Sequence, residues 1–424
     1  MAPANERSQR PTRTRHVVLW LTVLAYLIVY LDRVVIAAAA PQIQQEFGFS
    51  LVTMGFVFSA FQIGYSLFQI PGGWLSDKFG PRKVLTGMVV WWSAFTAMTT
   101  LAWSASSMIA IRFLFGVGEA GAFPTATRSL SRWMLPSERG YAQGLTHAGA
   151  RLGGALTPAF AVFLIAQYGW RTPFLLFAVI GVAWGILWYW YYRDSPTEHR
   201  GVNAAELAVI GPAAYGPKGA NVAVPWRQIL RSPQMWLLSA AYACYAYDFG
   251  TFITWFPKYL NDARGFSLTE IGIFASAPLA AGVLGDIIGG WVSDRMAEKS
   301  GDFKMARRLI FCPGMIAGSV LIYFAAITDS PYAAVGLFSA ALFCLELTVG
   351  VSWAVTLDIG HEYAGSVSSV MNTAGNLAIA VSATATGFIV THYDWQTNFL
   401  IQAALALLGG IIFLWVDASK RIYN

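Results

Sequence analysis

Charged residues are scarce in this chain: Asp, Glu, Lys and Arg make up 12% of its 424 residues. Soluble domains carry about 25%. Hydrophobic residues reach 56%, and the mean hydropathy is +0.52. This scarcity of charge excludes an ordinary soluble domain and predicts a protein that lies within a lipid bilayer.

Cysteine is also rare, and the motifs of several enzyme classes are missing. The three cysteines, Cys244, Cys312 and Cys344, all fall within apolar runs, so no disulfide framework and no Cys/His zinc site is predicted. The sequence has no G-x-x-x-x-G-K phosphate loop, and no nucleophile constellation stands out. We therefore expect neither an enzyme nor an ATP-driven pump, and we expect no cofactor.

Twelve apolar runs lie near the roughly 20-residue length that spans a bilayer. Helices are expected because they satisfy their backbone hydrogen bonds internally in lipid. The sequence predicts an all-α polytopic membrane protein with twelve transmembrane helices, over residues 17–40, 52–75, 84–103, 108–131, 141–167, 171–192, 235–260, 268–293, 308–328, 331–357, 364–391 and 396–417.

The net charge of +6 is distributed as a topology signal. With both termini in the cytoplasm, 22 of the 28 Lys and Arg residues fall on the cytoplasmic side. This positive-inside bias predicts that orientation, and it makes nucleic-acid binding an unnecessary explanation. The absence of any Asn-X-Ser/Thr sequon agrees with a bacterial inner (plasma) membrane.

The chain contains an internal repeat on either side of a polar, proline-containing stretch. Three landmarks recur at offsets of 217, 217 and 216 positions: Gly48-Phe49-Ser50 as Gly265-Phe266-Ser267, Asp77 as Asp294, and Asp32 as Asp248. Such duplication is typical of transporters that bind substrate between two halves. We predict two pseudo-symmetric six-helix bundles, with these parts: cytoplasmic tail 1–16, first bundle 17–192, cytoplasmic linker 193–234, second bundle 235–417 and cytoplasmic tail 418–424.

Four charged residues interrupt the apolar helices of the first half. Asp32 and Arg33 are adjacent, and Arg112 and Glu119 are seven residues apart, which puts them on one helix face. A charge at the centre of a membrane helix costs roughly 2.5–3.5 kcal/mol, so a functional site is the default interpretation. We predict that Asp32 pairs with Arg112 and that Arg33 lies near Glu119. A neutral packing network is the alternative.

Two groups of motifs resemble a known family. Gly73-x-x-x-Asp77-Lys78-x-Gly80-x-Arg82-Lys83 resembles the loop signature of the major facilitator superfamily, although Pro81 stands where Arg is usual. The segments Tyr30–Arg33 and Arg112–Pro124, with Asp194–His199, resemble the anion:cation symporter family, which includes bacterial sugar-acid carriers and animal vesicular glutamate and sialic-acid carriers. The resemblance implies proton-coupled uptake of an organic anion. It implies that Asp32 and Glu119 bind protons and that Arg33 binds the substrate, and the pairing predicted from the spacing adds Arg112 to the proton-coupling group.

Further polar residues are candidates for the substrate cavity. Gln62, Tyr65 and Gln69 share one helix face, which suits hydroxyl groups, although interhelical hydrogen bonding would also explain them. His147 and Arg151 share another face, where the family has neutral polar groups; Arg151 is either a second carboxylate anchor or the partner of Glu346. The remaining candidates are Trp353, Asn372 and Asn376 for the cavity, with packing as the rival for Trp353, and Asp77, Arg82, Asp294 and Arg295 for gating.

These features together predict a symporter that imports an organic anion by alternating access, driven by the proton gradient. A sugar acid such as a hexuronate or aldonate is the expected substrate. The alternatives are another carboxylate (an aromatic acid or a dicarboxylate), anion exchange, or a non-transporting membrane sensor. Export of cationic drugs is disfavoured by Arg33 and Arg151. The expected partners are the anion, protons and the lipid bilayer, with a monomer as the functional unit.

Overall fold

The computed structural model describes residues 10–135, 139–211, 225–360, 364–420 and 422. The first half contains seven long helices: α1 (Thr14–Phe47), α2 (Leu51–Phe79), α3 (Pro81–Met98), α4 (Ala105–Glu119), α5 (Ala122–Trp133), α6 (Arg139–Tyr168) and α7 (Arg171–Tyr191). The linker contributes two short helices, α8 (Ala204–Ile210) and α10 (Trp226–Arg231). The second half contains α11 (Pro233–Thr254), α12 (Phe256–Asp262), α13 (Leu268–Phe274), α14 (Ser276–Ser300), α15 (Phe303–Ile327), α16 (Pro331–Gly360), α17 (Ala364–His392) and α18 (Trp395–Phe413).

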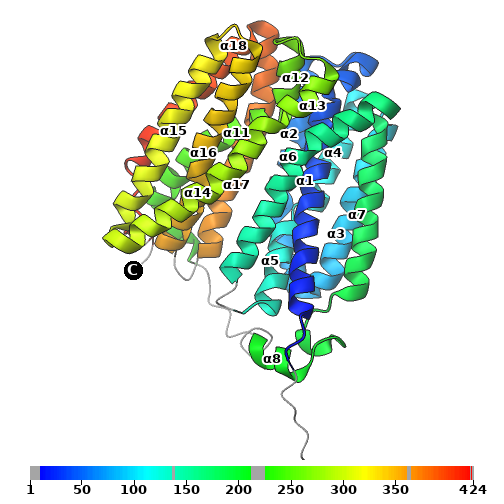
Figure 1. Cartoon of the computed structure of the whole chain (residues 1–424), viewed down its shortest axis with the longest axis vertical. Helices are drawn as coiled ribbons and strands as arrows, with labels where there is room; N and C mark the ends of the chain where they lie inside the picture. The colour runs from blue at the N-terminus through cyan, green and yellow to red at the C-terminus, as the bar shows by residue number, and fades with distance from the viewer. Residues whose placement is uncertain (1–9, 136–138, 212–224, 361–363, 421, 423–424) are drawn as a thin grey trace, which may run out of the picture.

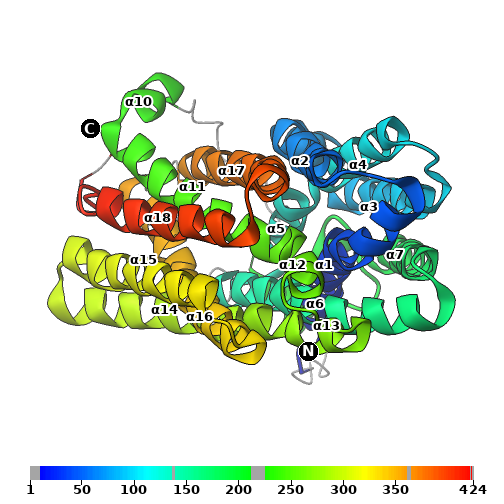
Figure 2. The ribbon, with the colours of Figure 1, turned by 90° about the horizontal axis from the view of Figure 1, so that it is seen from above.

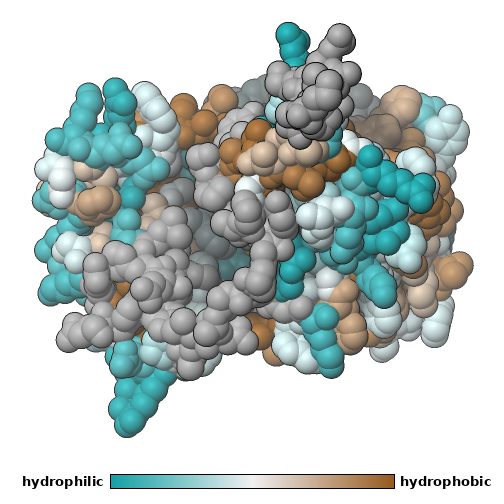
Figure 3. Space-filling view, turned by 90° about the horizontal axis from the view of Figure 1, so that it is seen from below, coloured by the Kyte–Doolittle hydropathy of each residue, from teal (hydrophilic) through white to brown (hydrophobic). Residues whose placement is uncertain are grey.

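The long helices run roughly side by side in two groups, one from each half of the chain (Figure 1). The view from above shows the same division, with α14 to α18 together and α1 to α4 and α7 on the other side (Figure 2). We call the end that carries α8 the linker end, and the opposite end the far end. Residues of hydrophilic type cover much of the face at the linker end that is not hidden by grey atoms (Figure 3).

Eleven helical stretches of the described chain are long and apolar enough to cross a membrane. The sequence predicts twelve spans, and α11 together with α12 supplies the element that the eleven leave out. Three predicted spans are each built from two helices: α4 with α5, α11 with α12, and α13 with α14. Most of the helices begin before or end beyond the predicted apolar limits, whereas α3 and α18 end earlier than predicted, at Met98 and Phe413.

The break between α4 and α5 follows directly after Glu119. Gly121 occupies it with φ −89° and ψ 0°. A Cβ at Gly121 would lie 2.8 Å from the Cα of Gly72, so a larger residue would collide with the backbone of α2. The glycine therefore permits the close crossing of α5 and α2 beside a charged residue.

The internal repeat is visible in the backbone. Gly48 and Gly265 both have positive φ, 66° and 69°. Two residues later, Ser50 and Ser267 each accept a hydrogen bond from the backbone three residues on and cap the next helix. Both positive-φ positions need glycine for the same reason, the lack of a Cβ, so the recurring tripeptide is a recurring turn.

The two halves pack against each other through small residues near the far end. Ser59 of α2 donates to the backbone oxygen of Ala380 on α17 at 2.5 Å and lies 2.6 Å from the hydroxyl of Thr384. Cβ atoms added at Gly55 or Gly387 would meet the opposing backbone at 2.7 and 2.4 Å. Small residues allow such close approach of helices in membranes.

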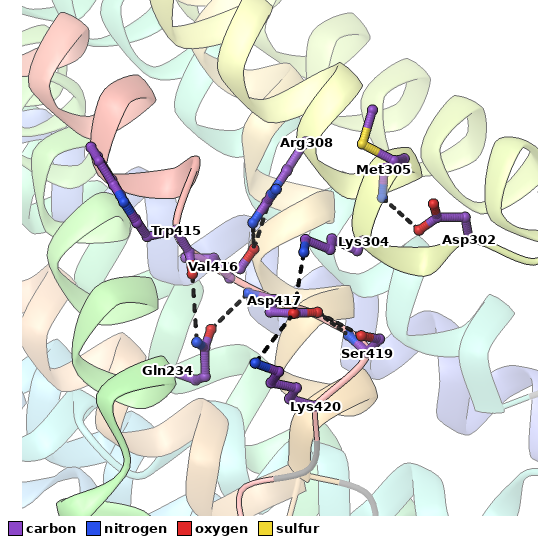
Figure 4. Close-up of polar contacts among 10 residues, drawn as sticks. All are labelled: Gln234, Asp302, Lys304, Met305, Arg308, Trp415, Val416, Asp417, Ser419 and Lys420. Carbon is purple, nitrogen blue, oxygen red and sulfur yellow. Dashed lines mark hydrogen bonds and ion pairs between the residues drawn. The ribbon is translucent and has the colours of Figure 1, made fainter.

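The segment after α18 folds back against the starts of α11 and α15 (Figure 4). Its backbone is held by Gln234, which accepts from the N–H of Asp417 at 2.7 Å, and by Arg308, which donates to the carbonyl of Val416 at 3.1 Å. Partial burial acts to raise the pKa of Asp417, but hydrogen bonds from Ser419 and Lys304 outweigh it and hold that pKa below its usual range. The carboxylate is therefore charged and fixes the segment to α15.

Candidate functional site

Arg33 of α1 and Glu119 of α4 form an ion pair inside the first half. The Arg33 Nε donates to Glu119 Oε1 at 2.9 Å, and Nη2 contacts the same oxygen. The Glu119 side chain is 0% exposed and that of Arg33 is 10% exposed. The predicted proximity of Arg33 and Glu119 is confirmed. Glu119 Oε2 is buried with no hydrogen-bond partner in the described part of the chain.

Aromatic rings surround the Arg33 guanidinium. Four rings lie near its Cζ: Tyr30 at 5.0 Å, Phe61 at 5.1 Å, Tyr65 at 4.9 Å and Phe123 at 6.0 Å. Such contacts stabilise a cation without neutralising it. The guanidinium therefore keeps its attraction for an anion when its carboxylate partner is removed.

Asp32 and Arg112 are buried near this pair without bonding to each other. Both carboxylate oxygens of Asp32 lack a hydrogen-bond partner among the described residues, as does Arg112 Nε. Arg112 lies over the rings of Phe61 and Phe115 instead, at 5.2 and 4.6 Å. The prediction of a direct Asp32–Arg112 pair is therefore wrong. Asp32 and Arg33 are successive residues of α1 and point about 100° apart. The side chain of Asp32 is thereby directed toward Trp92 and Thr96 of α3.

Arg151 of α6 joins the two halves through carboxylates of the second half. Its guanidinium lies 2.9 Å from Glu346 Oε2 on α16 and 3.7 Å from Asp286 Oδ2 on α14. The Tyr245 hydroxyl of α11 donates to Glu346 Oε1 at 2.8 Å. Of the two predicted roles for Arg151, pairing with Glu346 is present in this structure.

His147 lies one turn from Arg151 and also reaches toward the second half. Its ring centroid is 5.8 Å from that of Tyr26, 6.0 Å from that of Phe123 and 6.4 Å from that of Trp353 on α16. His147 is exposed and Trp353 is half-buried. The structure thus brings these two predicted cavity residues together across the halves.

The predicted amide residues lie on α2 and α17. Asn372 Nδ2 donates to Gln69 Oε1 across the halves at 3.4 Å, and Asn376 Nδ2 donates to the Asn372 carbonyl at 2.9 Å. Gln62 is buried, and its Oε1 has no partner among the residues described. Tyr65, also buried, packs on Arg33 as noted above.

The predicted gating residues lie apart from these groups, at the linker end. Arg82 donates from Nε to the Tyr189 carbonyl at 2.8 Å, within the first half. Asp294 accepts from Arg307 at 2.6 Å, and Arg295 is exposed. The side chain of Asp77 lies outside the described residues, and its gating role stays a prediction.

Three residues of these clusters were not singled out from the sequence as site residues. Asp286 lies within an apolar run and could have been found as a charge in a predicted span. Tyr30 opens the Tyr30–Arg33 motif but was given no role of its own, and Tyr245 carries no such signal. In the described residues, no group of three or more His, Cys, Asp or Glu could hold a metal ion.

One arginine–carboxylate pair buried within the first half and a second one between the two repeated helical halves are features expected of a secondary transporter. Comparison with known proteins agrees with this class. The sequence profile of the Major Facilitator Superfamily matches residues 22–383. The chain belongs to this superfamily, and the expected architecture of twelve helices is confirmed.

Several relatives are named as transporters of organic anions. The chain is 40% identical to a probable sulfoacetate transporter of Cupriavidus necator, over 96% of this chain and 94% of that protein. It is 32% identical to a hexuronate transporter of Bacillus subtilis (92% and 91%) and 30% identical to a probable galactarate/D-glucarate transporter of Escherichia coli (97% and 96%). The resemblance to the anion:cation symporter family is thereby confirmed, and the protein is a multi-pass transporter of organic anions, not an enzyme.

A solved structure shows the same fold. A bacterial homologue of the human lysosomal transporter Spinster, in an inward-facing and unoccupied conformation, matches with a TM-score of 0.79 at 17% identity. The match covers 96% of this chain and 98% of that one.

Proposed function

We propose that the protein is a proton-coupled symporter that imports a small organic anion by alternating access. The observation that carries this proposal is the Arg33–Glu119 pair, in which one buried carboxylate oxygen holds the guanidinium and the other has no partner among the described residues. A proton on Glu119 would remove the negative charge that competes for Arg33. An anionic substrate can then take the place of Glu119 on the same guanidinium.

The coupling follows from the energetics of buried charge. An unpaired ion inside the membrane costs several kcal/mol, so Arg33 must always have an anion beside it. When substrate leaves, Glu119 must give up its proton to pair with Arg33 again. Asp32, buried close by and without a hydrogen-bond partner in the described chain, is proposed as a second proton-binding residue, with Arg112 acting on both by its charge.

A sugar acid remains the proposed substrate. Of the three named relatives, one is a hexuronate transporter and another a probable galactarate/D-glucarate transporter. Gln62, Tyr65 and the Asn372–Asn376 pair would bind its hydroxyl groups, and His147 and Trp353 would contact it from the side of Arg151. The proton gradient supplies the energy, so no cofactor is required. We propose that a monomer acts in the bacterial inner membrane with both termini in the cytoplasm, and that Asp77, Arg82, Asp294 and Arg295 act in gating.

The proposal is tested by reconstitution of the purified protein into proteoliposomes. Uptake of a labelled organic acid is measured with an imposed inward proton gradient, without a gradient, and with a protonophore. Accumulation above the equilibrium level should require the gradient and should collapse with the protonophore. Uptake that is indifferent to the pH difference would contradict the coupling, and the protein would then be an exchanger or a uniporter.

A further inference from the structure

A second arginine–carboxylate group lies beside the Arg33 pair, and the proposed coupling does not use it. Arg151 is bonded to Glu346 through two of its nitrogens, at 3.0 and 2.9 Å, and lies 3.7 Å from Asp286. Its side chain is 16% exposed, that of Glu346 1% and that of Asp286 22%. Two carboxyl groups therefore share one guanidinium in a mostly buried position.

The arrangement repeats the design of the first pair. In each, a guanidinium from the first half is held by a buried glutamate, and in each it also rests on an aromatic ring, which for Arg151 is Phe249 at 5.1 Å. A purely structural contact between helices would be simpler if apolar, because buried ion pairs add little net stability. The repetition therefore indicates the same use, an anchor that exchanges a protein carboxylate for a substrate anion.

Tyr30 connects the two anchors in space. Its ring lies 5.0 Å from the Arg33 guanidinium, and the same residue lines a narrow cavity together with Arg151, Phe249 and Glu346. A Cβ added at Gly154 would stand 3.2 Å from a carbon of the Tyr30 ring, so the absence of a side chain there leaves room for the ring. One small molecule that crosses the Tyr30 ring could thus meet both guanidinium groups.

We propose that Arg151 is a second anion anchor and that the substrate is a small dianion, with one acid group on Arg33 and the other on Arg151. This inference rests on the proposed function of the Arg33 site. Glu346 occupies Arg151 when substrate is absent, as Glu119 occupies Arg33. Among the relatives' named substrates, sulfoacetate, galactarate and D-glucarate carry two acid groups, whereas hexuronate carries one.

Binding of a dianion also fixes how many protons the site takes up. A dianion that takes both arginines leaves Glu119 and Glu346 without their cations, so each glutamate takes up one proton, and the loaded site gains no net charge. The titratable and charged groups that surround Arg151 are Glu346, Asp286, Tyr245, Tyr242, His147 and Tyr30. Two protons are therefore expected to accompany each dianion.

The test is a binding panel on the purified full-length protein in detergent. It compares a sulfonate-carboxylate (sulfoacetate), a sugar dicarboxylate (D-glucarate) and a sugar monocarboxylate (D-glucuronate) by calorimetry and by the shift in Tm. Wild-type protein should bind at least one dianion about tenfold or more tightly than the monoanion. Arg151→Gln should reduce dianion affinity to the monoanion level, and the loss of monoanion affinity should be several-fold smaller than the loss for the dianion.

Arg151→Gln strands Glu346 and Asp286, so the double variant Arg151→Gln with Glu346→Gln provides a second test that avoids the unpaired glutamate. It should show the same loss for dianions. Glu346→Gln alone should bind dianions more tightly than wild type, because the competing carboxylate is gone.

Three outcomes would contradict the proposal. Equal weakening of both anion classes in the Arg151 variants would make Arg151 only a contact between the halves. Preference of the wild type for the monoanion would overturn the dianion while leaving the proposed function intact. Failure of every acid to bind would overturn the organic-acid site at Arg33 as well.

Discussion

The two arginine–glutamate pairs differ in what they join. Arg33 and Glu119 belong to α1 and α4, which lie in the same half, whereas Arg151 and Glu346 belong to α6 and α16, which lie in opposite halves. If the halves rock as rigid bodies, the first pair can persist through the movement. The second must break or rearrange. The first pair is therefore suited to set the charge of the site, and the second to couple that charge to the position of the halves.

The largest effect is expected at Arg33, the anchor within one half. Arg33→Gln should abolish detectable substrate binding, because loss of a buried charge partner costs about 2–5 kcal/mol, at least about 30-fold in Kd. Binding is measured by calorimetry on the purified protein. The double variant Arg33→Gln with Glu119→Gln controls for the stranded glutamate, and recovery of affinity in it would contradict Arg33 as the anchor.

Glu119→Gln should separate binding from coupling. The amide imitates the protonated acid and no longer competes for Arg33, so substrate exchange across proteoliposomes should continue. Accumulation driven by a proton gradient should fall to the equilibrium level. Counterflow and gradient-driven uptake are measured on the same preparation, and full accumulation by this variant would exclude Glu119 as an essential proton site.

The charged residues of the first half show which contacts could be predicted from the sequence and which could not. The spacing of Arg112 and Glu119 and the adjacency of Asp32 and Arg33 were enough to place Arg33 near Glu119. The same spacing could not predict the neighbours of Asp32. These neighbours are a tryptophan and a threonine of α3, and neither is charged, so the charge pattern of the sequence does not mark them.

The architecture of twelve spans followed from run lengths, since the apolar length of a span is set by the bilayer. The breaks within three of these spans could not be predicted from run lengths. The break at Gly121, for example, goes with the close approach of Gly121 to Gly72, which depends on how the helices pack. The sequence marks Asp286 as a charge within a predicted span, but its contact with Arg151 depends on the packing of α14 beside α6.

A smaller effect is expected at Asp32, which tests whether the first half contains one coupling carboxylate or two. Asp32→Asn should retain substrate binding within about threefold, because Asp32 has no bond to Arg33 in the described chain, and should lower gradient-driven uptake by about tenfold, the effect of 1.4 kcal/mol. Uptake is measured across external pH values. An unchanged pH profile would remove Asp32 from the coupling.

The smallest effect is expected at Asp248, the counterpart of Asp32 in the repeat. Asp248 is 0% exposed, and neither of its oxygens has a hydrogen-bond partner among the described residues. No ion pair joins Asp248 to another described residue, so Asp248→Asn removes no ionic contact there and replaces one polar group by another of similar size. Gradient-driven uptake and Tm should both remain close to wild type. A loss of accumulation equal to that of Asp32→Asn would show instead that both copies of the repeat bind protons, and the coupling would then belong to both halves.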